Sequence, residues 1–385
     1  MPQRAVSKLD AETFGLILDS VRRLVDEELI PAEAACDAEE QVPDRLVERM
    51  RGLGLFGLNI PADYGGLGLT MSEEVRVVFE LCRASPSFRA ILGTTVGVGG
   101  KSILFDGTEE QRRRWLPRIA SGETIVSFCL TEPGSGSDAK AMKTRAERTA
   151  QGWRLNGSKR FISNASIAGL FVVMARDGDR PGSVSAFLVE AGTPGLEVGP
   201  RWHKMGQRGG PVSDVFFNDC TIPADALLGN QQGMGFRTAM KTLDEARVHM
   251  AAVAVGLSRR LLAESLAYAR ERQQFGQPIA GFQLIQAMLA DSEAELAAAQ
   301  ALVEKTAGLR DEGAVVTRDA ASCKLFATET LSRIADRAVQ IHGGYGYMRD
   351  YAVERLFRDS RLLRIYEGTS QIMQLVIARE LLRGG

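Results

Sequence analysis

Cysteine and histidine are scarce in this chain of 385 residues, which contains five cysteines and three histidines. The cysteines form no CxxC pair, and no histidine lies near one at the spacing of metal ligands. We therefore expect free, buried thiols in a reducing compartment, with neither disulfides nor a metal site. No apolar run approaches the length of a membrane span, and MPQRAVSKLDAE lacks the charged-then-apolar pattern of a secretion signal. A cytoplasmic protein is expected.

A strong charge of either sign is also missing, since the formal net charge is -1. This balance gives no electrostatic preference for nucleic acid or for an anionic membrane surface. Hydrophobic residues make up 45% and charged residues 25%, which is typical of a soluble globular protein. The length predicts two or three domains with a large buried core.

Three regions with different sequence patterns follow one another along the chain, and together they predict an α+β fold. Residues 1–123 are mostly helical in pattern, and residues 124–232 contain short β-favouring runs separated by turn residues. Residues 233–385 return to long helices, the first with an apolar stripe from Leu243 to Leu261 at intervals of three or four residues. We expect an N-terminal helical domain, a middle antiparallel sheet or barrel, and a C-terminal helix bundle.

Four motifs stand out, and none of them indicates a function alone. FCLTEPGSGSD (128–138) follows a β-run, so its glycines and hydroxyls form a loop that can approach a large polar ligand or a plain surface turn. KRFISNAS (159–166) has the pattern of an ordinary strand and turn, and RERQQFGQPIAGFQ (270–283) has that of a helix end. The glycines of QIHGGYGY (340–347) are typical of a helix C-cap.

A fifth motif carries an unusual carboxylate. In RIYEGTSQIMQLVIAREL, Glu367 stands between Tyr366 and Gly368, just before an apolar helical pattern. Burial raises the pKa of a carboxyl group and makes it a better base, whereas a nearby helix N-terminus favours its ionised form. The sequence leaves the balance between these two effects open.

Together these motifs resemble the acyl-CoA dehydrogenases, in order and at family spacing, over nearly the whole chain. The resemblance runs from IPADYGGLGLT through LTEPGSGSD, RFISNA, LDEAR, ERQQFG and QIHGGYGY to YEGTSQI. It implies an N-terminal helical domain, a middle β-barrel and a C-terminal four-helix bundle. It also implies FAD as cofactor and a homotetramer built as a dimer of dimers.

The resemblance implies α,β-dehydrogenation of an acyl-CoA to the trans-2-enoyl-CoA. Glu367 corresponds to the base that removes the α-proton while a hydride passes to flavin N5, and electron-transfer flavoprotein is the implied acceptor. Ser137, Asp244, Arg247 and Gly368 correspond to substrate contacts. The implied FAD-binding residues are Phe128, Leu130, Thr131, Gly136, Ser137, Phe161, Ile162, Ser163, Arg272, Phe275, Gln283, Gln340, Gly343, Gly344, Thr369 and Gln371.

Two positions need comment against the family pattern. The commoner Trp-Ile-Thr is Phe161-Ile162-Ser163 here, which keeps a hydroxyl beside the flavin but loses the indole. Some branches carry the base on the helix that reads LDEARVHM, where this chain has Ala246. Glu245 is one residue away, about 100° around the helix, and we interpret it as a solvated helix charge.

The acyl group and three other functions stay open. Four glycines within ILGTTVGVGGKSI (91–103), where the family builds part of its acyl pocket, indicate either extra pocket room or close helix packing. We expect a short, medium or branched acyl chain. The alternatives are an acyl-CoA oxidase, for which 385 residues is short; nitroalkane oxidation or monooxygenation, against which Glu367 argues; and a non-catalytic CoA-ester binder.

Overall fold

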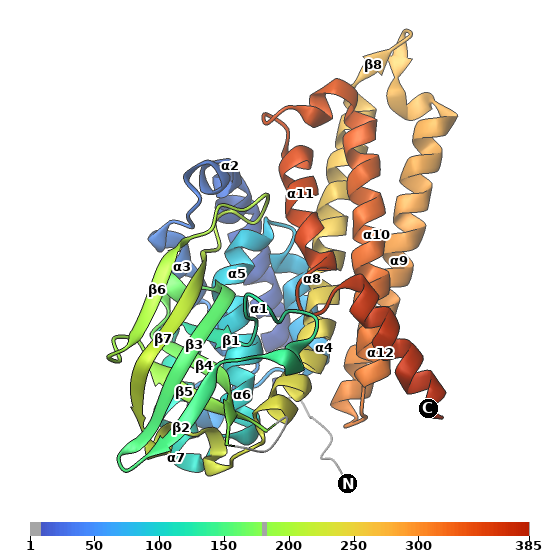
Figure 1. Ribbon diagram of the computed structural model, residues 1–385. Helices are drawn as coiled ribbons and strands as arrows, with labels where there is room; N and C mark the ends of the chain where they lie inside the picture. The colour runs from blue at the N-terminus through green and yellow to red at the C-terminus, as the bar shows by residue number, and fades with distance from the viewer. Residues whose placement is uncertain (1–8, 179–182, 385) are drawn as a thin grey trace.

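The elements occur in the predicted order of helices, strands and longer helices (Figure 1). The structure, a computed structural model, describes residues 9–178 and 183–384. This order confirms the predicted α+β class, while the exact domain limits stay predictions. All five cysteines are buried free thiols.

The N-terminal helices form one apolar core of their own and share a second with the C-terminal bundle. Capping boxes begin two of them: Thr70 accepts from the backbone N–H of Glu73, and Thr108 does the same with Gln111. In Figure 1 most of these helices lie behind or above the sheet, and Met71–Leu81 is on the side of the bundle. They are α1 (Ala11–Leu24), α2 (Ile30–Glu39), α3 (Asp44–Gly52), α4 (Met71–Leu81), α5 (Pro86–Thr94), α6 (Gly100–Asp106) and α7 (Glu109–Ala120).

The middle domain is an open half-barrel of seven strands in the order β1-β4-β2-β3-β7-β6, with β5 on β4. The strand pairs β1–β4 and β2–β4 are parallel, although the sequence predicts an antiparallel sheet. The intervening strands give the chain the long crossover that parallel pairing needs. The strands are β1 (Val126–Cys129), β2 (Arg145–Thr149), β3 (Gly152–Ser163), β4 (Leu170–Asp177), β5 (Val184–Glu190), β6 (Leu196–Arg201) and β7 (Val212–Pro223).

The C-terminal bundle is built around α8, which is buried on every side from Glu245 to Ser258. The predicted single apolar stripe underestimates this burial because α4 covers α8 together with its neighbours in the bundle. The structure also contains α11, a helix that the sequence analysis did not predict. Its buried face includes the polar residues Asp359 and Ser360, so its sequence shows few apolar residues at helical spacing. The elements are α8 (Gly235–Glu271), β8 (Gln273–Gln274), β9 (Gln277–Pro278), α9 (Gln283–Asp311), α10 (Thr317–His342), α11 (Ala352–Arg361) and α12 (Ser370–Leu382).

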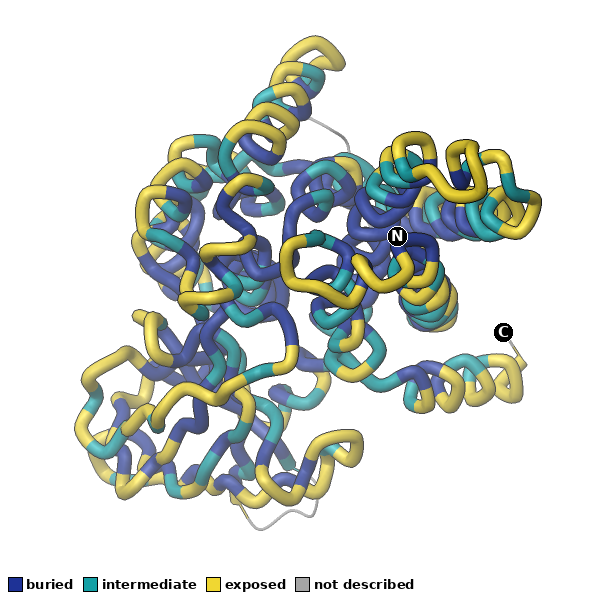
Figure 2. Tube along the Cα trace, turned by 90° about the horizontal axis from the view of Figure 1, so that it is seen from above, coloured by how far each residue is buried: buried dark blue, intermediate teal, exposed yellow. Residues whose placement is uncertain are grey.

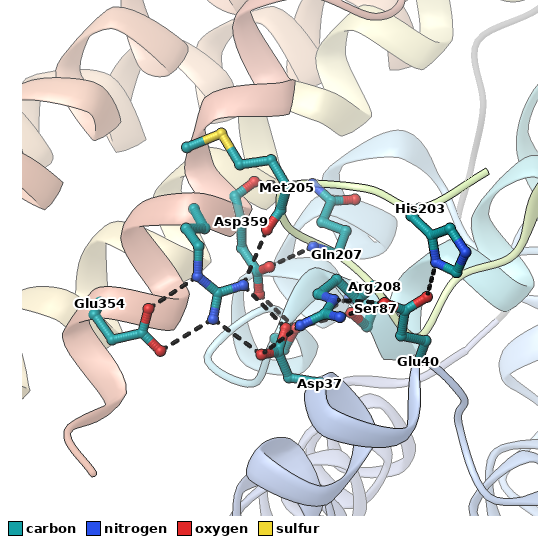
Figure 3. Close-up of polar contacts among 11 residues, drawn as sticks. Asp37, Glu40, Ser87, His203, Met205, Gln207, Arg208, Glu354 and Asp359 are labelled. Carbon is teal, nitrogen blue, oxygen red and sulfur yellow. Dashed lines mark hydrogen bonds and ion pairs between the residues drawn. The ribbon is translucent and has the colours of Figure 1, made fainter. Parts of the chain in front are cut away.

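Buried segments gather at the centre, where the domains meet, while α12 leads to the exposed C-terminus (Figure 2). A polar network joins the domains at this centre (Figure 3). Arg358 of α11 donates to Asp37 of α2 at 2.9 and 3.1 Å, and Arg208 of the β6–β7 loop pairs with Glu40. The carboxylate of Asp359 accepts from the backbone of that same loop. These contacts fix α11, and hence the loop that follows it, against the other two domains.

Candidate active site

The Glu367 loop connects α11 to α12 and has an unusual backbone. Glu367 has φ 56°, in the left-handed region that non-glycine residues seldom occupy, and Gly368 follows at φ 94°. Thr369 caps α12, its hydroxyl accepting from the backbone N–H of Ile372 at 3.2 Å. Conformations of this kind carry a cost and cluster at functional sites. The turn presents the Glu367 carboxylate just before a helix N-terminus.

Lys324 of α10 holds this turn in place by hydrogen bonds. Its side chain is fully buried, and its Nζ donates to the carbonyl of Tyr366 at 3.0 Å and to that of Gly368. One ammonium group thus binds the carbonyls on both sides of Glu367. The sequence reasoning missed Lys324, although a single lysine within the apolar helix stretch CKLF was the available signal.

The pKa of Glu367 is raised, and desolvation by burial is the largest cause. The charges of Arg89, Lys324 and Arg247 act in the opposite direction, with Arg89 the strongest of the three. Desolvation of the Glu367 carboxyl therefore outweighs the three cations, and the net direction of its pKa shift is upward. A carboxylate with a raised pKa is a stronger base than one in water.

The rival base position is apolar, and its neighbour is engaged elsewhere. Ala246 is buried in α8. Glu245 is 6% exposed and pairs with Lys101 at 2.9 Å and with Arg310 of α9. The interpretation of Glu245 as a solvated helix charge is therefore wrong, because α4, α6 and α9 close over this part of α8. Its ion pairs hold it away from a role as base.

Of the four expected substrate residues, Arg247 and Gly368 lie beside Glu367, and Asp244 lies beside Arg247. Arg247 donates to Asp244 at 2.7 Å, and a methyl group built at Gly368 would stand 3.9 Å from Nη2 of Arg247. That methyl would also stand 2.6 Å from Cε of the flexible Met373 side chain, and the φ of 94° is what favours glycine at this position. Ser137 is exposed on the loop after β1, and no contact in the described ranges joins it to Glu367.

The two middle-domain motifs lie next to each other at the ends of β1 and β3. The backbone N–H of Arg160 donates to Thr131 at 2.9 Å, and the hydroxyl of Ser127 donates to the carbonyl of Ser163 at 2.7 Å. A bulge in β3 gives Phe161 φ 56° and leaves its ring 58% exposed, while Ile162 is buried. Phe128 and Leu130 are partly buried on the core beside it, and Gly136 is exposed on the loop.

Glu132 anchors the Gly/Ser loop that follows β1 to neighbouring segments, which a plain surface turn would lack. Its buried carboxylate accepts from Lys143 at 2.5 Å and from Thr144 at 3.0 and 2.6 Å. It also pairs with the buried Lys159 at 2.8 Å. Glu132, which the sequence analysis did not single out, therefore binds the loop to β3 and to the two residues that lead into β2.

The remaining expected FAD residues form a separate set at the end of the bundle. Figure 1 shows β8 at this end, far from the sheet. Arg272 and the glycines 343 and 344 line a cavity, and Arg272 lies 5.3 Å above the ring of Tyr345. Phe275 is 94% exposed beside it, and Gln283 and Gln340 are exposed at the ends of α9 and α10. Thr369 and Gln371 lie apart from this set, on α12 next to Glu367.

Comparison with known proteins decides the family. The chain matches the acyl-CoA dehydrogenase N-terminal, middle and C-terminal domains over residues 12–123, 127–220 and 233–382. The chain belongs to the acyl-CoA dehydrogenase family. It is an oxidoreductase that acts on the CH–CH bond of acyl-CoA thioesters with FAD as cofactor.

Individual relatives match over almost the full length. The chain is 41% identical to acryloyl-CoA reductase (NADH) of Anaerotignum propionicum, over 94% of this chain and 92% of that one. It is 40% identical to the mitochondrial short-chain specific acyl-CoA dehydrogenase of Homo sapiens, over 97% and 90%. Butyryl-CoA dehydrogenase from Megasphaera elsdenii superposes with a TM-score of 0.94 at 34% identity, covering 98% of this chain and all of the other.

The residues present fit FAD, as the family requires. A methyl group built at Gly136, Gly343 or Gly344 would meet nothing within 4 Å, so the backbone at these positions is open to a ligand. Arg272 provides the planar cation that suits a pyrophosphate. The individual FAD and substrate positions stay predictions.

The glycines of residues 91–103 have different roles. A methyl group at Gly99 would stand 2.7 Å from Val126, and one at Gly100 would stand 2.7 Å from the carbonyl of Thr95, which indicates close packing. At Gly93 the methyl would stand 2.3 Å from Cζ of Arg89. Gly93 therefore makes room for a guanidinium group.

Over residues 9–178 and 183–384, no helix combines the length and apolar character that crossing a bilayer requires. The cytoplasmic location and the homotetramer stay predictions.

Proposed function

We propose that this chain oxidises an acyl-CoA to the trans-2-enoyl-CoA, with Glu367 as the base that removes the α-proton. The supporting observation is the raised pKa of a carboxylate held in a left-handed turn beside Arg247 and Gly368. Glu367 receives the α-proton, and its backbone N–H is available to polarise the thioester oxygen. The bound FAD supplies the hydride acceptor. Lys324 and Thr369 hold the turn in which Glu367 lies.

The proposal places the two sets of FAD residues in different copies of the chain. The middle-domain set and the bundle-end set lie at opposite sides of one protomer in Figure 1. One FAD contacts both sets only if a second copy brings its bundle end to the first copy's sheet. This requirement supports an assembly of at least two copies, as in the expected homotetramer, and sedimentation measures the number of copies directly.

Electron-transfer flavoprotein is the proposed acceptor. A relative from Acetobacterium woodii, 39% identical, is named as a subunit of a caffeyl-CoA reductase–Etf complex. The relatives differ in the acyl group that they are named for: short-chain acyl, acryloyl, cyclohexane-1-carbonyl and glutaryl. The acyl group must therefore be inferred from this chain's own residues.

The direct test is Glu367→Gln in the FAD-loaded protein. We expect the flavin spectrum to persist while the anaerobic bleaching rate with acyl-CoA falls at least about a thousandfold, as expected when the essential base is removed. Glu312→Gln, at an exposed carboxylate on the end of α9, is the matched control. Near-normal bleaching in Glu367→Gln would refute the assignment. Because the pKa of Glu367 is raised, the acid limb of kcat/KM should lie above the ordinary 4.5 of glutamate.

The direction of the reaction needs a separate assay, because one relative is named a reductase. The wild-type protein is given enoyl-CoA with a reduced dye, and acyl-CoA with an oxidised dye. A higher kcat/KM for acyl-CoA supports dehydrogenation, and the reverse order would assign the chain to enoyl-CoA reduction.

A further inference from the structure

Arg89 is a buried cation without a carboxylate partner. It belongs to α5 and is 9% exposed. Its Nε donates to Nε2 of His249 at 3.0 Å, and its Nη1 reaches only the sulfur of Met250 at 3.9 Å. Within the described part of the chain, no carboxylate oxygen lies within 4.0 Å of the guanidinium. An unpaired buried charge is costly, so its retention calls for an explanation.

His249 does not neutralise this charge. An arginine can only donate, so Nε2 of His249 is the acceptor and the ring proton is on Nδ1. Nδ1 then donates to Glu74 at 2.9 Å. Desolvation lowers the pKa of His249 to about 4, so the ring is neutral at pH 7. The guanidinium is therefore in contact with a neutral group.

The charges behind His249 are already matched. Glu74 pairs with Lys101 at 3.3 Å, Lys101 with Glu245 at 2.9 Å, and Glu245 with Arg310. The series thus contains two carboxylates and two cations, of which Arg310 is partly exposed, and Arg89 adds a third cation at its other end. An anion in direct contact with Arg89 therefore has to bind in the space in front of its guanidinium group.

That space adjoins the base. Arg89 has the strongest effect of the three cations that act on Glu367. Gly93, one turn further along α5, leaves room for the guanidinium. The Nη2 atom has no hydrogen-bond partner in the described ranges and is not among the side-chain nitrogens that are fully enclosed without one. An unused donor of Arg89 therefore remains accessible to a ligand.

We propose that Arg89 binds a carboxylate carried by the acyl group, which makes the preferred substrate a mono-CoA thioester of a short dicarboxylic acid. The planar guanidinium can donate two parallel hydrogen bonds to a carboxylate, and this pairing supplies the missing charge. Arg89 is a specificity residue under this proposal, and Glu367 keeps its role as base. The proposal rests on the proposed dehydrogenation.

Matched pairs of thioesters test the proposal with the FAD-loaded protein. In each pair an isopropyl group replaces a carboxylate of the same shape: succinyl-CoA with 4-methylpentanoyl-CoA, glutaryl-CoA with 5-methylhexanoyl-CoA, and adipyl-CoA with 6-methylheptanoyl-CoA. The readout is the ratio of kcat/KM within a pair, measured with a dye acceptor. We expect at least one dicarboxylic member to exceed its partner by about tenfold or more, as a charge-assisted hydrogen bond provides.

Three variants separate a binding role from a structural one. Arg89→Met should abolish or invert the preference, and Arg89→Lys should keep part of it. Gly93→Ala keeps the charge but displaces the guanidinium, so it should reduce the preference as well. Each variant is first checked for bound FAD. If Arg89→Met loses FAD, the other two variants and the wild-type ratio still decide the question.

Two outcomes would overturn the proposal. A wild type that prefers the isopropyl member of every pair has no carboxylate site. A wild-type preference for carboxylates that all three variants leave unchanged would place that site elsewhere and make Arg89 structural. Failure of the proposed function is distinguishable, because then no thioester of either kind is oxidised.

Discussion

Lys324→Met tests whether one buried ammonium group holds the base in place. Burial lowers the pKa of Lys324 to about 8 from 10.5, which corresponds to a charge-burial cost of roughly 3 kcal/mol. Its two hydrogen bonds to the carbonyls around Glu367 return about 1.5–3 kcal/mol each. The variant removes both contributions, so its free energy of unfolding should fall by only about 0–3 kcal/mol. Catalysis should suffer more, since a misplacement of about 1 Å costs on the order of a hundredfold in rate.

The assay measures three quantities on one preparation: urea unfolding at fixed FAD concentration, substrate KM, and the rate of anaerobic flavin bleaching. We expect the bleaching rate to fall about a hundredfold, with a small change in KM. Lys305→Met, at an exposed position of α9, is the control. Unchanged bleaching in a folded Lys324→Met protein would refute the reasoning.

The pH dependence of stability provides an independent check on Lys324. The folded-state pKa is lower than the unfolded one, so the unfolded chain binds more protons between pH 8 and 10.5. The contribution of Lys324 to the free energy of unfolding of the wild type therefore rises with pH across that window. The Lys324→Met variant has no such group and shows no such rise. The difference in unfolding free energy between wild type and variant should widen from pH 7 to pH 10, and a constant difference would contradict the assigned cause.

Two further predictions concern the buried carboxylates of Asp359 and Glu132. Burial raises the pKa of Asp359 to about 6 from 3.8, so its contribution to stability is fully present below 3.8 and is lost as pH rises through 6. Asp359→Asn should therefore gain in melting temperature relative to wild type between pH 5 and pH 7.5, and an equal difference at both would count against this pKa. Glu132→Gln leaves the buried Lys159 without its anion, which costs about 3–5 kcal/mol. We expect weaker FAD retention on gel filtration, and a loop that keeps FAD at wild-type affinity would show that Glu132 does not anchor it.

The sequence predicted the order of helices and strands because each region has a local period. The stripe from Leu243 to Leu261 and the β-runs after Thr124 repeat at the spacings of a helix and a strand. The parallel pairing of β1 with β4 and the burial of α8 on all sides are set by partners distant in sequence. Local periodicity contains no information about such partners.

The residues of the candidate site also fall into two groups, those that the sequence motifs predict and those that only the tertiary structure reveals. Glu367, Arg247 and Gly368 belong to motifs, and the structure brings them together. Lys324 and Arg89 belong to none, because their roles depend on which helix faces the Glu367 turn. Glu245 shows the opposite error: it seemed solvated because the sequence does not reveal that Lys101 and Arg310 approach it.

The charges around Glu367 connect substrate recognition with the chemistry. Arg247 is paired with Asp244, and Lys324 is bound to two carbonyls, so both cations are committed to fixed partners. Arg89 has neither a carboxylate nor a carbonyl partner in the described ranges, and it has the strongest pKa-lowering effect of the three cations on Glu367. A carboxylate that binds Arg89 removes that effect and raises the pKa of Glu367 further, which makes it a stronger base only when the correct substrate is bound. Binding energy used in this way lowers the reaction barrier, so a dicarboxylic thioester should gain in kcat as well as in KM.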